Sequence, residues 1–93
     1  MKLKDLAQVQ IGLEIADFWI TRRGSMQTIG QPSRTFNKES IGIKVERDDI
    51  LNSDFLYYVI LNLYNSKYWH PFAHGTLKLV NIRIEDVKNL EFE

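Results

Sequence analysis

The chain has 93 residues, of which 44% are hydrophobic and 26% charged, and twelve Lys and Arg residues balance twelve Asp and Glu residues. This length accommodates one domain and excludes two, since domains cluster near ~100–150 residues. The composition excludes disorder as the main state. Neutrality excludes a surface that binds phosphate everywhere, so any nucleic-acid site must be a local patch. The absence of cysteine excludes both a disulfide framework and a thiolate zinc site.

Hydropathy gives no indication of a membrane protein or a secreted one. The first five residues already carry charge, and no apolar run of signal-peptide length follows them. The longest apolar run, residues 55–61, falls short of the ~18 residues that span a bilayer. We therefore expect a cytoplasmic protein that makes no membrane contact.

The first predicted elements are strands. Apolar and polar residues alternate along residues 6–11, as in a half-buried strand. Residues 13–20 fit either a broken strand or a helical face, and the aromatic and β-branched residues 18–21 favour the strand. Residues 22–38 contain four turn-forming residues, which predicts a loop with a short strand at 26–29. The alternation of Ile41, Ile43 and Val45 with polar or small residues predicts the next strand.

The hydrophobic period then changes to that of a helix. Ser53 is predicted to cap a helix that begins at Asp54, whose carboxylate suits the positive end of the helix dipole. This helix ends near Asn65, and its apolar face comprises Phe55, Leu56, Val59, Ile60 and Leu63. A short strand at Leu77, Leu79 and Ile82 and a short helix at 85–90 follow. The predicted fold is therefore α+β in a single domain, residues 1–93, with a small mixed or antiparallel sheet packed against one central helix (about 54–65) and a short C-terminal helix.

Several passages resemble the target recognition domain of type I restriction-modification specificity subunits. They are the strand followed by residues 48–51, the aromatic start of the helix at 55–58, the Gly75-Thr76 pair, and the spacing of Ile84, Val87 and Leu90. The earlier Gly24-Ser25-Met26 and Ile29-Gly30-Gln31-Pro32 are similar to a glycine-rich passage of that family. The resemblance covers about three quarters of the chain and implies a fold that reads DNA.

The chain also departs from that family. Its members usually carry two such domains, separated by long helices that recruit methyltransferase subunits, and each domain is usually longer than this chain. We therefore expect a half-size, stand-alone module that binds duplex DNA, alone, as a homodimer or with a methyltransferase subunit.

The candidate DNA-binding residues fall in two clusters. Arginine can meet guanine edges or phosphate, and glutamine can pair with adenine in the major groove. The first cluster, in a loop without acidic residues, comprises Arg22, Arg23, Ser25, Gln27, Gln31, Ser33, Arg34 and Lys38. The second, which is mixed with aromatic residues, comprises Lys67, His70, His74 and Lys78. The alternative is a solvated loop for the first cluster and core or interface aromatics for the second.

Neither a metal site nor catalytic chemistry is expected. His70 and His74 have helical metal-ligand spacing, but Pro71 and Gly75 interrupt a helix and the sequence indicates no third ligand. The glycines are too widely spaced for a phosphate-binding loop or a nucleophile elbow. We expect no enzymatic activity and no small-molecule cofactor.

The alternative function is a protein-interaction module with no DNA contact. Its surface would consist of tyrosines and a tryptophan, residue types that are enriched at interfaces. This surface comprises Tyr57, Tyr58, Tyr64, Tyr68 and Trp69.

Overall fold

The computed structural model of the chain describes residues 1–76 and 78–92. Its helices and strands alternate irregularly along the chain. In chain order they are α1 (Leu3–Leu6), β1 (Ala7–Ile11), β2 (Phe18–Ile20), β3 (Arg23–Gly24), β4 (Pro32–Ser33), β5 (Ile41–Val45), α2 (Ser53–Asn65), the 3₁₀ helix η1 (His70–Phe72), β6 (His74–Gly75), β7 (Val80–Asn81) and α3 (Ile84–Lys88).

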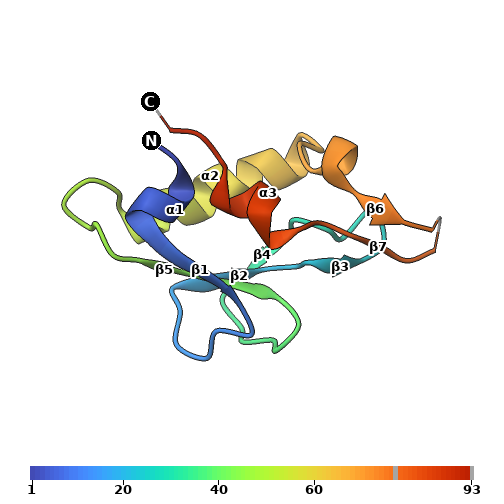
Figure 1. Cartoon of the computed structure of the whole chain (residues 1–93), viewed down its shortest axis with the longest axis horizontal. Coiled ribbons are helices and arrows are strands. Elements are labelled where there is room, and N and C mark those ends of the chain that lie inside the picture. Colours follow the sequence, from blue (N-terminus) through green and yellow to red (C-terminus); the bar gives the residue numbers. More distant parts are fainter. Residues whose placement is uncertain (77, 93) are drawn as a thin grey trace.

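The strands form two sheets, and every pairing in them is antiparallel. One sheet has the order β1-β5-β2-β4 and the other β3-β7-β6. Figure 1 shows the three α-helices on one side of these strands, with β6 and β7 at one end of the long axis. The predicted α+β class is confirmed, with the difference that the small sheet is divided in two.

The two strands with the clearest alternation are confirmed. β1 and β5 pair along their whole length, from Ala7 with Val45 to Ile11 with Ile41. The predicted strand at 13–20 is shorter than expected, because the Asp17 carboxylate accepts a 2.8 Å bond from the Val45 N–H and only β2 continues the sheet. No strand forms at 26–29, where the Ser25 carbonyl accepts bonds from the N–H groups of Thr28 and Ile29 and closes a turn.

The central helix is confirmed, but its capping residue is not Ser53. The Asn52 side chain accepts a 3.0 Å bond from the Phe55 N–H, so the cap lies one residue earlier. Leu56 and Ile60 are fully buried, whereas Phe55 is 61% exposed, so only part of the predicted apolar face enters the core.

The C-terminal elements agree in kind with the prediction. The strand is β7, and Leu77 lies outside the described residues; the helix is α3, which begins and ends slightly earlier than predicted. The helical turn α1 was not predicted, because one turn of helix is too short to show a period.

Trp69 belongs to the core and not to the predicted aromatic surface. Its side chain is 1% exposed and lies against Tyr68 and Phe72, with ring centroids 4.9 and 6.0 Å away. Gly30 meets the other side of the indole: a Cβ atom there would lie 2.0 Å from Trp69 Cδ1. Gly30 also has a φ of +83°, a conformation that favours glycine. This contact anchors the 22–38 loop to the core.

Candidate nucleic-acid interface

Charge is distributed unevenly along the neutral chain. Neither residues 18–38 nor residues 55–84 contain a single Asp or Glu. Seven of the twelve basic residues lie in these two segments: Arg22, Arg23, Arg34, Lys38, Lys67, Lys78 and Arg83. The remainder of the chain is therefore strongly acidic, and any fold that brings the two segments together creates a local basic patch.

The structure joins the two segments by strand pairing. β3, from the first segment, pairs with β7 from the second, and β6 pairs with β7 on its other edge. The Ile82 N–H extends this ladder with a 2.9 Å bond to the Arg22 carbonyl. We call the end of the molecule formed by β3, β6, β7, Lys78 and residues 64–70 the basic end.

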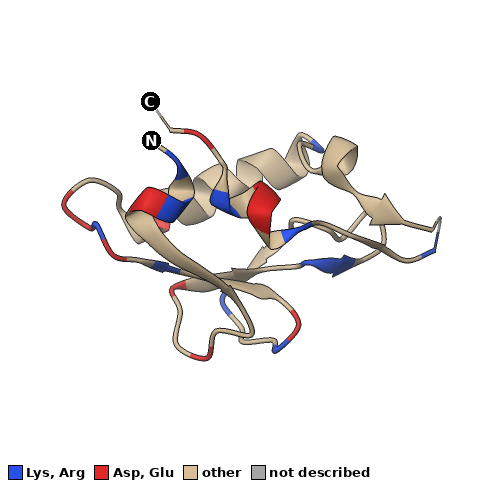
Figure 2. Cartoon of the chain, in the orientation of Figure 1, with Lys and Arg blue, Asp and Glu red and all other residues tan. Residues whose placement is uncertain are grey.

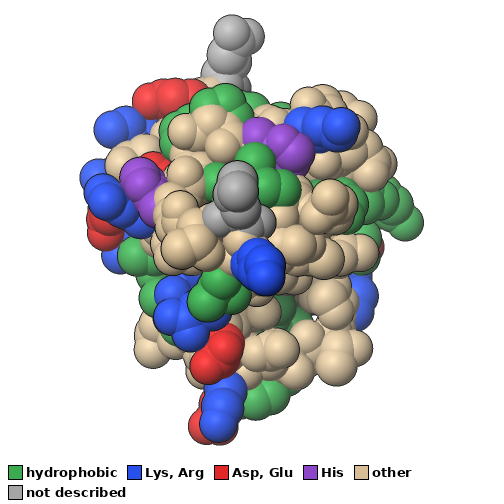
Figure 3. Space-filling view, turned by 90° about the vertical axis from the view of Figure 1, so that its right-hand side faces the viewer, with side chains coloured by type: hydrophobic (Ala, Val, Ile, Leu, Met, Phe, Trp, Pro, Cys, Tyr) green, Lys and Arg blue, Asp and Glu red, His purple; other side chains and the backbone are tan. Residues whose placement is uncertain are grey.

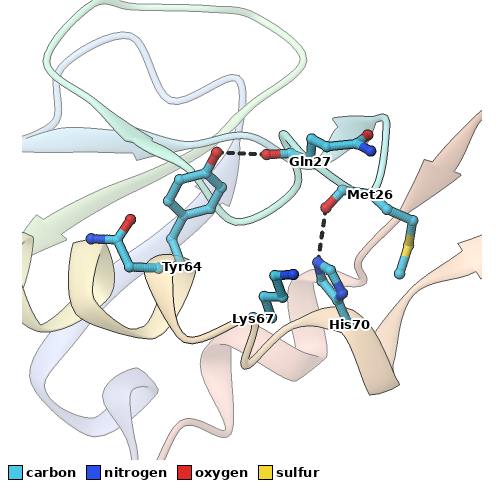
Figure 4. Close-up of a pocket in the computed structure, with 6 residues that line it drawn as sticks. Met26, Gln27, Tyr64, Lys67 and His70 are labelled. Carbon is cyan, nitrogen blue, oxygen red and sulfur yellow. Dashed lines mark hydrogen bonds between the residues drawn. The ribbon is translucent and has the colours of Figure 1, made fainter.

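Side-chain hydrogen bonds add a second connection between the segments. The Tyr64 hydroxyl donates to the Gln27 carbonyl at 2.5 Å, and Nε2 of His70 contacts the Met26 carbonyl at 2.9 Å. Figure 4 shows these bonds on either side of Lys67, and together these residues line a pocket of about 350 Å³ with Asn65. A carbonyl oxygen only accepts, so Nε2 carries the proton and Nδ1 of His70 is the ring nitrogen left for another partner.

The residues of the basic end include Arg and Lys and no Asp or Glu. Figure 2 shows blue on β3 and no red on β3, β6 or β7. Figure 3 faces this end and shows both histidines among basic side chains, with acidic ones toward the left and the bottom. Arg23, Lys67 and Lys78 are exposed, and none of them forms an ion pair with another described residue.

Lys67 occupies an unusual backbone position. Its φ is +62°, and it follows the last turn of α2, where its N–H bonds to the Tyr64 carbonyl and that of Tyr68 bonds to the Leu63 carbonyl. This is the Schellman arrangement, whose left-handed residue is usually glycine. A lysine there carries a backbone cost of about 1 kcal/mol, which the favourable interaction of a cation with the helix dipole offsets in part.

Some of the predicted contacts lie away from this pocket. Gln31, Ser33 and Arg34 line a separate hollow of about 490 Å³ beside Tyr57. Arg34 is held within the chain: its guanidinium bonds to Asp54 at 3.0 Å and lies 4.2 Å from the centre of the Tyr57 ring. Both hollows border the same side of α2, because Tyr57 and Tyr64 are two helical turns apart.

The other predicted residues have mixed surroundings. Arg22 is half-buried and its Nε donates to the Glu39 carbonyl at 3.0 Å. Ser25 takes part in the turn with Thr28, and the Ser33 hydroxyl accepts from the Thr35 N–H. The side chains of Gln27, Gln31 and Lys38 are exposed and make no hydrogen bond to another residue within 1–76 or 78–92.

The structure places one residue at the basic end that sequence reasoning missed. Asn81 lies on β7, the central strand, opposite Arg23 on one side and His74 on the other. In the sequence it is an isolated amide within an apolar segment, which carries no signal of its own.

Outside the basic end, the carboxylate of Asp49 is paired with an arginine of the same chain. Asp49 accepts two hydrogen bonds from Arg47, at 2.9 and 3.0 Å, and this bonding lowers the pKa of the Asp49 carboxyl and raises that of the Arg47 guanidinium. Within the described ranges, no three His, Asp or Glu side chains are grouped as metal ligands.

No protein-family model matches the chain, and neither a curated protein nor a solved structure shows significant similarity to it. Among the described residues, no helix combines the length and the apolar character needed to cross a membrane.

Proposed function

We propose that the chain is a duplex DNA-binding module of the kind that the target recognition domain resemblance implies, and that it binds without catalysing a reaction. The observation that carries this proposal is the basic end, where two acid-free segments of a neutral chain meet. Unpaired cations there can neutralise phosphates, which is the main source of affinity in protein–DNA binding. Like charges gathered at one end repel one another, so this arrangement does not favour folding.

Specificity requires groups that read base edges, because phosphate contacts carry no sequence information. Gln27 and Gln31 are exposed amides on either side of Ile29 and Gly30, which are both buried. The buried pair fixes the backbone, so the two amides extend from a rigid support. An amide can form two hydrogen bonds to adenine in the major groove.

Salt dependence tests the proposal. Fluorescence polarisation would measure binding to a labelled random-sequence duplex between 20 and 200 mM salt. The logarithm of the binding constant should fall linearly with the logarithm of the salt concentration. Contacts to three to six phosphates predict a slope between about −3 and −5. The absence of binding at the lowest salt, or a slope near zero, would contradict DNA binding. Single-stranded DNA of the same sequence serves as the control for duplex preference.

A second candidate function is a protein-interaction module, and one surface favours it. Phe55 and Tyr58 are 61% and 63% exposed on α2. Phe55 also borders an apolar groove of about 430 Å³ that contains Leu63, Leu90 and Phe92. A homodimer or a restriction-modification partner such as a methyltransferase subunit could cover this face. Sedimentation equilibrium at rising concentration would detect self-association, and a Phe55→Ser variant should abolish it.

A further inference from the structure

The register of the three-stranded sheet sets a row of side chains at the basic end. Arg23 and His74 both pair with Asn81, from opposite edges of β7. Residues directly opposite in antiparallel strands have side chains on the same face of the sheet. Neighbouring strands lie about 4.8 Å apart, so this row is about 10 Å wide.

Burial shows that the row faces outward. Val80 and Ile82, on either side of Asn81, are 6% and 1% exposed, so they face the core and Asn81 faces the other way. Arg23 and His74 are exposed, and Asn81 is half-buried between them. The Asn81 amide forms no hydrogen bond with another residue of the described ranges. It is therefore free to bind a ligand.

The hairpin that carries this row lies at the far end of the molecule. β6 and β7 lie at one end of the long axis in Figure 1. Thr76 closes the turn: its N–H donates to the Leu79 carbonyl at 3.0 Å, and its hydroxyl accepts from the Leu79 N–H at 3.2 Å. Gly75 is required beside it, since a Cβ atom there would lie 2.4 Å from the Leu79 carbonyl oxygen.

We propose that the β6–β7 hairpin enters the major groove of DNA and that Asn81 reads an adenine there, an inference that rests on the proposed function. The major groove, about 12 Å wide, admits a two-stranded β-ribbon; β6 and β7 form such a ribbon, and β3 adjoins only its β7 edge. Asn forms two bonds to adenine N6 and N7. Lys78 beside the turn and Arg23 on the adjoining strand then reach the phosphates that flank the base.

The test uses the duplex that selection with the full chain enriches. Asn81→Ala should weaken binding to that duplex by about 5- to 150-fold and leave binding to an unrelated duplex unchanged. Asn62, exposed on α2, provides the matched control, and Asn62→Ala should change neither affinity. Circular dichroism of both variants would establish that they remain folded.

Modified DNA makes the assignment independent of any effect on folding. Replacing each adenine of the enriched duplex in turn by 7-deazaadenine removes its N7 acceptor. For one adenine, the wild-type protein should lose affinity and Asn81→Ala should lose none. If every replacement weakens both proteins equally, Asn81 reads no adenine, although DNA binding stands. If the wild-type protein binds no duplex, the proposed function fails and this inference fails with it.

Discussion

Replacing Arg23, Lys67 and Lys78 together by Gln is expected to reduce affinity for duplex DNA about 500-fold at 0.1 M salt, since each lost phosphate contact contributes a factor of about 8 there. The slope of log K against log salt should move toward zero by about 2.7. These three cations are exposed and have no carboxylate partner among the described residues, so their removal should leave folding nearly unchanged.

A charge-matched variant separates location from net charge. Lys4, Lys44 and Arg47 lie outside the two acid-free segments, and replacing them by Gln changes the total charge equally. Affinity and salt slope, measured by polarisation, should then change little. Equal losses in the two triple variants would show that overall charge determines binding and that the basic end has no special role.

Trp69→Ala is expected to destabilise the protein by about 3–5 kcal/mol, the usual cost of removing a large buried aromatic side chain. Small domains have a total stability of about 5–15 kcal/mol, so much of it would be lost. The indole is 1% exposed and fills the space between Tyr68, Phe72 and Gly30. Urea denaturation followed by far-UV circular dichroism would show a midpoint about 2–3 M lower.

Two further substitutions control this measurement. Tyr58→Ala removes an aromatic ring that is 63% exposed and should change stability by less than about 0.5 kcal/mol. Trp69→Phe should cost less than Trp69→Ala, because it keeps a ring and removes an indole N–H that has no hydrogen-bond partner among the described residues. If Trp69→Ala lowered the stability as little as Tyr58→Ala, Trp69 would not be packed in the core.

The elements with a sustained hydrophobic period could be predicted from the sequence. β5 and α2 are long enough for their periods of two and about 3.6 residues to emerge, and each lies close to its expected position. β3, β4, β6 and β7 have two residues each and no period. They exist because the chain returns to pair with distant residues, as Arg23 does with Asn81, and local patterns carry no such information.

The residues of the candidate site also differ in how far the sequence alone predicts them. The basic character of residues 22–38 is visible in composition, because it depends only on which residues are present. Two assignments needed three-dimensional structure. Trp69 could be core or surface beside a helix end until its contact with Gly30 was known, and Asn81 acquires a candidate role only through its strand neighbours Arg23 and His74.

Selection from a random duplex pool at low salt tests most directly whether this module reads DNA sequence. The protein should enrich one short sequence that contains adenines, and the Gln27→Ala, Gln31→Ala double variant should retain bulk DNA binding while it loses preference at one or more of those positions. Recovery of a pool with no enriched sequence, from rounds in which the wild-type protein demonstrably retained DNA, would contradict sequence reading.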